Sequence, residues 1–381
     1  MNVECLETLD ALEPYWARWD ELAGDCVFRS ALWQRTWIEH YCFCAQSSEQ
    51  QADSNLRVIV VRDDSDQIVA ILPCYEKQSF ALGRVWRLVG DGEVCSDHLG
   101  FLFEQERADQ AVEAIAEYLA RRDDWDCFDF TYFDANDDAS CLLAEVLKTH
   151  NCFVESSPGP NCWSIDLPET WDGYLMMLSK SHRKHIRRLQ RSAAAAGPIE
   201  WHLVEDEQDF EAAWANLVDL HQRRRHSLGE PGCFASTSWA EFHKDIAQKL
   251  LSAGILRLSS LELGGRFAAA EYQFATPTTI SAYQGGLDPD RLDEQPGRLS
   301  LSHTIQHAIS QGCTRYDLMR GDEPYKASWR AEPNRTLRVQ VTPARLSARL
   351  RFTALQSVRK AGRFAKQMAG NTRKQTELIN E

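Results

Sequence analysis

The chain contains 381 residues, a length that predicts two domains, and its 44% hydrophobic and 26% charged residues are typical of a globular protein. The net charge of −14 argues against general nucleic-acid binding, although residues 342–381 carry nine Lys/Arg against two Asp/Glu. Because no run of about 18 apolar residues occurs and the N-terminal stretch is acidic, we expect neither a transmembrane helix nor a secretory signal.

The first half is expected to contain helices, a β-meander, and then alternating helices and strands. Helices rich in Trp and Leu are expected over residues 8–46, and apolar runs separated by polar turns predict strands. The further elements, in chain order, are expected as strands at 55–63, 67–76, 85–92 and 97–103, a helix at 107–122, a strand at 127–133, a helix at 140–150 and a strand at 162–167.

The second half is expected to repeat this order. The predicted elements are helices at 171–196, 208–225 and 237–254, strands at 255–263, 266–275 and 279–287, a helix at 296–312, a strand at 315–319, a brief helix, and a strand at 336–342. The repeated order indicates a duplicated α/β unit. We therefore predict one domain at 1–165, a second at 166–345, and a basic helical tail at 346–381.

The twelve cysteines follow no metal-binding or disulfide pattern. The sequence has no C-x2-C motif, and Cys74 and Cys127 lie within apolar runs, where a free cysteine behaves as a small core residue. We therefore predict a reduced, cytoplasmic chain with no bound metal. Cys95, Asp97 and His98 lie together, but residues adjacent in sequence seldom have the geometry of a Cys–His nucleophile.

The loop before the helix at 296–312 has the features of a phosphate site. Gly297 allows a ligand to approach the backbone closely, and Arg298 adds a positive charge. The first N–H groups of the helix are unsatisfied and favour an anion. A Pro-Gly turn that only starts the helix is the alternative interpretation, and local sequence leaves both open.

Longer segments resemble a known family. LSKSHRKHIRRLQRSAAAAG, LHQRRRHSLGEPGCF, YQGGLDP, QPGRLSLSHTIQHAISQG and YDLMRGDEPYKASW are similar to the signature blocks of CelD/BcsL-type acetyltransferases of the GNAT superfamily, which are linked to cellulose and exopolysaccharide synthesis. The resemblance covers roughly residues 10–345 and extends to FemAB-like aminoacyltransferases, which also have tandem GNAT units. It implies an α/β fold of two GNAT-like domains, with mixed central sheets flanked by helices. The first domain would be degenerate, because it has no glycine loop before its helix.

The same resemblance implies acetyl-CoA, or another acyl-CoA, as co-substrate, and a sugar or exopolysaccharide precursor as acceptor. The strand at 279–287 would place Tyr283, Gly285 and Gly286 beside the acyl group, where backbone N–H groups bind its carbonyl oxygen. The loop would hold the co-substrate through Gln295, Gly297 and Arg298. Tyr325 would protonate the leaving thiolate, because its ordinary pKa of about 10 suits that task.

Carboxylates in the second half are the candidate bases. Glu271 and Asp317 rank first because each interrupts an apolar strand, although a buried ion pair explains either residue equally well. Arg320 and Lys326 are near enough in sequence to pair with Asp317. The other residues of this segment that we expect to contact substrate are Asp322, Glu323 and Trp329.

A cationic face is predicted on the helix within 171–196. Six cations recur at helical spacing: Lys180, Arg183, Lys184, Arg187, Arg188 and Arg191. Their mutual repulsion, a few tenths of a kcal/mol for each adjacent pair, requires an anion nearby. The anion would be a phosphorylated or uronic-acid substrate, the CoA phosphates, or the acidic first half. We assign Arg183, Lys184 and Arg187 to substrate binding, and a solvated charged face is the alternative.

The sequence therefore predicts an acyltransferase that acts on an amine or a hydroxyl. One alternative is a FemAB-type peptidyl transferase that uses aminoacyl-tRNA, in which the cationic face contacts tRNA. Another is a non-catalytic adaptor recruited through the basic tail. That tail has Leu346, Leu350, Leu355 and Val358 at helical spacing, which would suit an anionic membrane or a partner. Packing on the acidic body of the same chain is the favoured interpretation.

Overall fold

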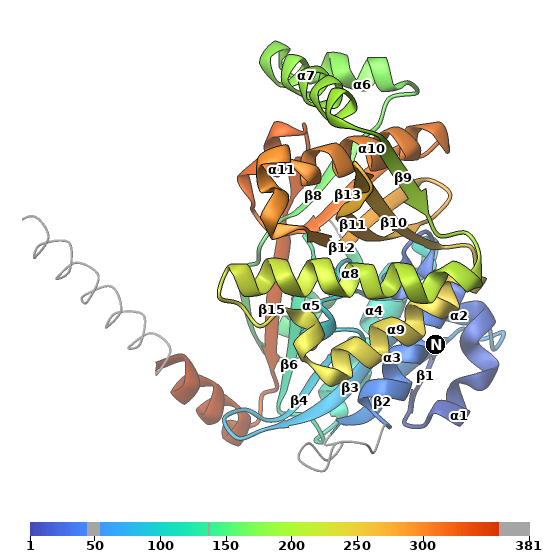
Figure 1. The fold of residues 1–381 in the computed structure, drawn as a ribbon. Coiled ribbons are helices and arrows are strands. Elements are labelled where there is room, and N and C mark those ends of the chain that lie inside the picture. The colour runs from blue at the N-terminus through green and yellow to red at the C-terminus, as the bar shows by residue number, and fades with distance from the viewer. Residues whose placement is uncertain (44–53, 136–137, 358–381) are drawn as a thin grey trace, which may run out of the picture.

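The computed structural model describes residues 1–43, 54–135 and 138–357, and these residues build two mixed β-sheets flanked by helices (Figure 1). The end of the first predicted helical segment, at 44–46, and the tail from 358 to 381 lie outside the described residues. Within the described ranges, no helix is both long and apolar enough to cross a membrane.

The first sheet has eight strands within the described residues, in the spatial order β1–β2–β3–β4–β6–β15–β7, with β5 paired to β3. The pair β4 and β6 is parallel. Helices α4 and α5 precede β6 and β7 respectively. The elements are β1 (Asn2–Leu6), β2 (Ser54–Arg62), β3 (Ile68–Ser79), β4 (Gly83–Leu88), β5 (Leu102–Phe103), α4 (Ala108–Arg121), β6 (Cys127–Asp134), α5 (Asp138–Thr149), β7 (Phe153–Pro158) and β15 (Thr336–Thr342).

The second sheet has seven strands within the described residues, in the order β14–β8–β13–β12–β11–β10–β9. Within the described residues, β12 and β13 are parallel, and the other strand pairs of this sheet are antiparallel. Its elements are β8 (Cys162–Asp166), α6 (Trp171–Met177), α7 (Lys180–Ala196), β9 (Ile199–Leu203), α8 (Glu207–Ser227), α9 (Thr237–Ser252), β10 (Leu256–Leu263), β11 (Arg266–Ala275), β12 (Thr279–Leu287), α10 (Pro296–Ser310), β13 (Arg315–Arg320), α11 (Pro324–Ser328) and β14 (Glu332–Asn334).

Sheet membership differs from the predicted domain division, 1–165 and 166–345, at two strands. The boundary falls inside β8, which belongs wholly to the second sheet. β15, predicted in the second domain, instead pairs with β6 and β7 of the first sheet. The chain thus returns to the first sheet after completing the second, and the two-domain division remains a prediction.

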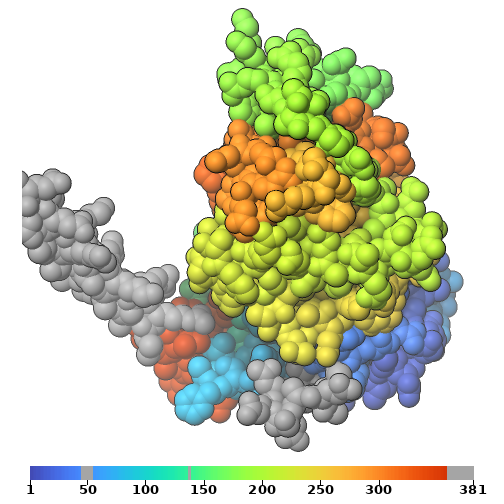
Figure 2. Space-filling model, in the orientation of Figure 1, coloured from blue at the N-terminus to red at the C-terminus, as the bar shows by residue number. Residues whose placement is uncertain are grey.

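Helices from both halves pack between the two sheets. α3 (Ala31–Tyr41) of the first half contacts α9, and α8 lies against β11 and β12 (Figure 1). The ring of Trp33 on α3 lies 5.4 Å from that of Phe242 and 5.3 Å from that of Phe274. Figure 2 shows α8 and α9 as a continuous band between the elements of the second sheet and the N-terminal segment. Buried side chains of both halves therefore form one hydrophobic cluster.

Most predicted elements are confirmed, and the differences concern edges and breaks. Strands β1, β7, β9 and β14 were not predicted, because they are short and partly exposed and lack a strong apolar pattern. The single helix expected at 171–196 is two helices. Ser179 separates them and caps α7, since its Oγ accepts a hydrogen bond from the His182 N–H at 3.2 Å.

The described part of the C-terminal tail packs on the first half, as favoured. The helical segment 346–357 buries Ala348 and Phe352, while Leu346 and Leu350 are exposed. Arg345 and Arg351 approach the Asp126 carboxylate at 3.1 and 3.6 Å. Opposite charge between the tail and the acidic body thus contributes to docking this segment.

Candidate active site

A cavity of about 690 Å³ opens in the second half where β12 and β13 separate. The two strands pair only as far as Ser281 and Asp317, although β12 continues to Leu287 and β13 to Arg320. On its other edge β12 carries a bulge at Tyr283 in the ladder with β11. Backbone groups of β12 beyond the split therefore lack β13 as a partner and face the cavity.

Many sequence-predicted site residues line this cavity. They are Glu271, Tyr283, Gly285, Gly286, Gln295, Gly297, Arg298, Arg320, Glu323, Tyr325, Lys326 and Trp329. The predicted residues absent from its lining are Asp317, Asp322, Arg183, Lys184 and Arg187. The structure thus gathers residues from β11, β12, β13, α10 and α11, spread over about 60 positions of the sequence, around one space.

Glu271 is the cavity carboxylate with the most perturbed environment. It lies opposite Gly285 in the β11–β12 ladder, and its Oε1 accepts a hydrogen bond from Ser300 Oγ at 2.9 Å. Burial raises the pKa of Glu271 to about 7, and the Ser300 hydrogen bond opposes that rise. A carboxylate with a pKa near neutrality can accept a proton and remain substantially ionised at physiological pH.

The two glycines of β12 are required by close packing. A Cβ at Gly285 would lie 2.9 Å from Glu271 Oε2, and a Cβ at Gly286 would lie 2.5 Å from the backbone nitrogen of His221 on α8. The His221 ring also hydrogen-bonds the Gly285 carbonyl at 3.0 Å through Nδ1. The cavity end of β12 is therefore held between Glu271 on one side and α8 on the other.

The N-terminus of α10 forms another wall of the cavity. Gln295 is its N-cap residue, with φ of 54°, and Gly297 and Arg298 follow in the first turn. The Gln295 side chain accepts no bond from the helix; its Oε1 instead contacts His185 Nε2 on α7 at 2.8 Å. The first-turn N–H groups thus have no side-chain cap, as an anion site requires.

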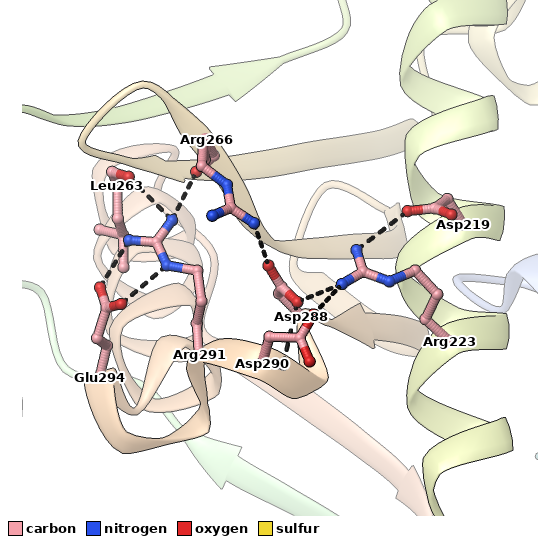
Figure 3. A network of polar contacts seen from close by, with 8 residues as sticks. All are labelled: Asp219, Arg223, Leu263, Arg266, Asp288, Asp290, Arg291 and Glu294. Atoms are coloured by element: carbon pink, nitrogen blue, oxygen red, sulfur yellow. Dashed lines mark hydrogen bonds and ion pairs between the residues drawn. The ribbon is translucent and has the colours of Figure 1, made fainter.

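A polar network fixes the loop that leads into α10 (Figure 3). Arg223 of α8 contacts the carboxylates of Asp288 and Asp290 at 2.7 and 2.9 Å, and Asp288 is almost completely buried. Arg291 donates to the Leu263 and Arg266 carbonyls at 2.9 and 3.2 Å and pairs with Glu294. These contacts tie the loop to α8 and to the β10–β11 hairpin, so the position of the α10 N-terminus is set by both.

Tyr325 and Lys326, on α11, have different environments. Tyr325 is 44% exposed at the cavity, and burial of its hydroxyl, with the charges of Glu323 and Glu271, raises its pKa to about 12. Lys326 is buried, and its Nζ donates to the carbonyls of Met319, Arg320 and Gly321 at 3.0 to 3.1 Å. Tyr325 is thus a protonated hydroxyl open to a ligand, whereas Lys326 holds the turn after β13.

Asp317 is turned away from the cavity and toward the first half. Its Oδ2 lies 2.7 Å from His98 Nε2, and its Oδ1 accepts from the Met319 N–H at 2.7 Å. The predicted pairing of Asp317 with Arg320 or Lys326 is therefore wrong, because both cations have other partners. Arg320 Nε pairs with Asp97 at 3.0 Å. The geometry gives no support to Asp317 as a base.

Asp322 and Trp329, in the segment after β13, form hydrogen bonds with other parts of the chain. Asp322 accepts hydrogen bonds from Asn161 Nδ2 at 2.8 Å and Trp163 Nε1 at 3.0 Å, which lower its pKa. Trp329 is buried, and its carbonyl accepts from Tyr174 Oη at 2.7 Å. The sequence trio of Cys95, Asp97 and His98 belongs to the contact between the halves, because Asp97 and His98 pair with Arg320 and Asp317.

The cationic face of α7 lies at the far end of the second sheet from the first half (Figure 1), so the acidic first half does not offset it. Arg183 donates to the Leu175 carbonyl at 3.2 Å, and Arg187 lies 3.8 Å from exposed Asp172. In the described part of the chain, no carboxylate pairs with Lys180, Lys184, Arg188 or Arg191. A second cavity of about 650 Å³ is lined by the start of α7 together with Gln295 and Arg298.

Metal ligation has little support among the described residues. Glu200, His202 and Glu262 form one cluster whose ligand atoms lie within 4.8 Å of one another, but two of the three are exposed and the cluster is on β9 and β10, outside the cavity lining. Cys74, Cys162 and Cys313 are buried free thiols.

Sequence reasoning missed the contribution of α8. His221, Arg224, Arg225 and Leu228 all line the cavity. The segment LHQRRRHSLGEPGCF resembles a family block, and it contains a basic run at the end of the predicted helix. The signal available was a cluster of cations beside a glycine-rich loop within an acidic chain.

Comparison with known proteins supports the fold. Residues 180–327 match a family model described as acetyltransferase (GNAT) domain. Among solved structures, the chain is similar to FemX, at 10% identity over 89% of this chain and 97% of that chain, with a TM-score of 0.60. It is also similar to L-PGS from Bacillus licheniformis, at 10% identity over 94% and 97% of the two chains, with a TM-score of 0.51.

A third similar structure is the C-terminal domain of a putative lysylphosphatidylglycerol synthetase from Agrobacterium fabrum, at 12% identity over 90% and 96% of the two chains, with a TM-score of 0.51. No curated protein matches the chain. At such identities these structures show the fold alone. The predicted fold class, two tandem GNAT-like units, is confirmed, and the domain match supports acyl transfer as the class of chemistry.

Proposed function

We propose that this chain is an acyl-CoA-dependent acyltransferase, with acetyl as the acyl group, that acts on an amine or hydroxyl of a sugar or exopolysaccharide precursor, as in CelD/BcsL-type enzymes. The observation that carries the proposal is the juxtaposition of Glu271 with the split between β12 and β13. A carboxylate with a pKa of about 7 there lines one cavity together with the part of β12 that has no β13 partner and with the start of α10, whose first turn has no side-chain cap.

The chemistry assigns each group one task. Glu271 accepts the proton of the acceptor amine or hydroxyl as its lone pair attacks the thioester carbonyl. Backbone N–H groups of β12 near Tyr283 stabilise the charge that develops on the carbonyl oxygen. The C–S bond then breaks, and the Tyr325 hydroxyl gives its proton to the leaving thiolate. Gln295, Gly297 and Arg298 bind the phosphates of the co-substrate at the start of α10.

Thermal denaturation with acetyl-CoA, longer acyl-CoAs and free CoA tests this proposal. A ligand at about 100 times its dissociation constant stabilises the folded state by roughly 2.7 kcal/mol, which raises the melting temperature measurably. We expect a rise with acetyl-CoA and a smaller rise for Arg298→Gln at equal concentration. Absence of a rise with every one of these ligands would contradict the proposal.

A FemAB-type peptidyl transfer from aminoacyl-tRNA is the second candidate function. It is favoured by the likeness to FemX and by the cations of α7 that lack carboxylate partners among the described residues. This candidate predicts tRNA binding that weakens steeply with salt, and no stabilisation by acetyl-CoA. Filter binding of tRNA at two salt concentrations, beside the denaturation experiment, decides between the two.

A further inference from the structure

The last turns of α8 form the cavity wall across from α10. His221 is buried and contacts Gly285, and Arg224 and Arg225 follow it by three and four residues. Residues at these spacings lie on one face of a helix, which is why all three side chains reach the cavity. One helical turn, about 5.4 Å, separates His221 from the two arginines along the axis.

Arg224 is the cavity cation of α8 that has no acidic partner. Arg223 is neutralised by Asp288 and Asp290, and Arg225 pairs with Glu230 at 2.8 Å. Arg224 is half-buried, and its Nη1 donates a hydrogen bond to Ser227 Oγ at 3.5 Å. No carboxylate of the described residues lies within ion-pair distance of its guanidinium. A half-buried guanidinium without a counter-charge is best explained by an anion that enters the cavity.

A short chain of contacts connects Glu271 with the Arg224 guanidinium. The Glu271 carboxylate packs against Gly285, Gly285 is bonded to His221, and Arg224 is one turn beyond His221. The other end of the cavity is the start of α10, where the proposed function places the co-substrate phosphates. Arg224 lines the same cavity on α8, and the proposed function leaves this part of the cavity for the acceptor.

We propose that Arg224 binds an anionic group of the acceptor, so that the substrate class is an acidic sugar carrying a carboxylate or a phosphate. This inference rests on the proposed function, because it assigns the acceptor end of the same cavity. Arg224 also opposes the negative end of the α8 dipole, but Arg225 occupies the same last turn and does so as well. The dipole alone therefore does not require an unpaired arginine in the cavity.

Three sugars that differ in the group at C6, one neutral and two anionic, test the proposal by binding. Glucose, glucuronate and glucose 6-phosphate are titrated at constant ionic strength, with and without saturating CoA, and the melting temperature is followed. We expect glucuronate, glucose 6-phosphate or both to stabilise the wild type saturably and glucose to have no effect. A response to one anion alone identifies the carboxylate or the phosphate as the recognised group.

Variants separate Arg224 from general charge effects. Arg224→Gln keeps helix propensity and should weaken the anion response at least tenfold, while Arg121→Gln, at an exposed arginine of α4 in the first half, should leave it unchanged. Arg224→Lys keeps the charge without the planar fork and should bind with intermediate affinity. The inference is overturned if neither anion exceeds glucose, or if Arg224→Gln responds as the wild type does.

The change in melting temperature with CoA distinguishes a failure of this inference from a failure of the proposed function. Loss of the CoA response in Arg224→Gln, with the anion response kept, would assign Arg224 to the co-substrate and overturn the inference while the proposed function stands. Absence of a CoA response in the wild type would contradict the proposed function. The anion titrations without CoA would then still show whether Arg224 forms an anion site.

Discussion

Ionisation of Glu271 should control the rate of acyl transfer, because only its carboxylate form can accept the acceptor proton. With a pKa of about 7, kcat/KM should rise tenfold per pH unit below that value and level off above it. Glu271→Gln should lower kcat by about 10²–10⁴-fold and abolish this dependence. CoA release measured from pH 5.5 to 9 checks both. An unchanged profile in the variant would exclude Glu271 as the base.

The raised pKa of Glu271 also predicts how the stability of the folded protein depends on pH. The pKa of Glu271 is raised, so the folded state disfavours the ionised form. This destabilisation is absent below the ordinary pKa and is complete above pH 7. Glu271→Gln should therefore gain stability relative to wild type as pH rises from 5 to 8, in urea unfolding.

Local sequence could nominate Glu271 but could not separate it from Asp317. Both residues interrupt apolar strands, and the sequence pattern around them is similar. Their difference comes from partners far along the chain: His98 engages Asp317, and no cation pairs with Glu271 among the described residues. A contact across about 220 residues leaves no periodic signal, so the role of each carboxylate follows only from the structure.

The loop from β12 to α10 should lose rigidity without Arg223. Arg223→Met leaves the buried Asp288 carboxylate with Arg266, at 3.6 Å, as its one cation among the described residues, beside the Asp290 N–H at 3.1 Å. It should lower the free energy of unfolding by about 1–3 kcal/mol. It should also weaken CoA binding, because the loop positions the start of α10. Asp290→Asn removes the exposed partner of the same arginine and should change stability by less than about 1 kcal/mol. Equal effects of both variants in urea unfolding would contradict this account.

Elements with strong periodicity were predictable, and the features that create the cavity were not. Helices α4, α8, α9 and α10 and the β10–β11–β12 meander follow from apolar spacing and turn residues. The split between β12 and β13 and the bulge at Tyr283 depend on strand pairing, which single-strand patterns do not encode. The glycines Gly285 and Gly286 indicated from the sequence where the site lies. The close approach of Glu271 and α8, which explains why glycine occupies these positions, is visible only in the structure.

The two halves act as one molecule because strands, core and charges cross between them. β15 returns to the first sheet, and aromatic rings of α3 pack on α9 and β11. At the end of β13, Asp97 and His98 of the first half pair with Arg320 and Asp317 of the second. The first half thus positions β13, the strand that borders the candidate active site.

The pair of His98 and Asp317 should stabilise the whole molecule in a pH-dependent way. Burial opposes protonation of His98, but the hydrogen bond and charge of Asp317 outweigh it and raise the pKa of His98 above its ordinary value. For a raised histidine pKa, the stabilisation is fully present below the ordinary value of about 6.5 and is lost as pH rises through the folded-state pKa. His98→Gln should therefore lower the free energy of unfolding by about 1–3 kcal/mol at pH 5.5, and by less at pH 9.

Urea unfolding at the two pH values measures this difference, with His202→Gln as the control for a solvent-exposed histidine–carboxylate contact on β9. If the pair fixes β13 across the interface, His98→Gln should also raise the KM for acyl-CoA at pH 5.5 more than at pH 9, since Met319 and Arg320 line the cavity directly after Asp317. A loss of stability that is equal at both pH values would show that His98 contributes by packing and not by its charge. A change in KM without any change in stability would place its effect in the cavity itself.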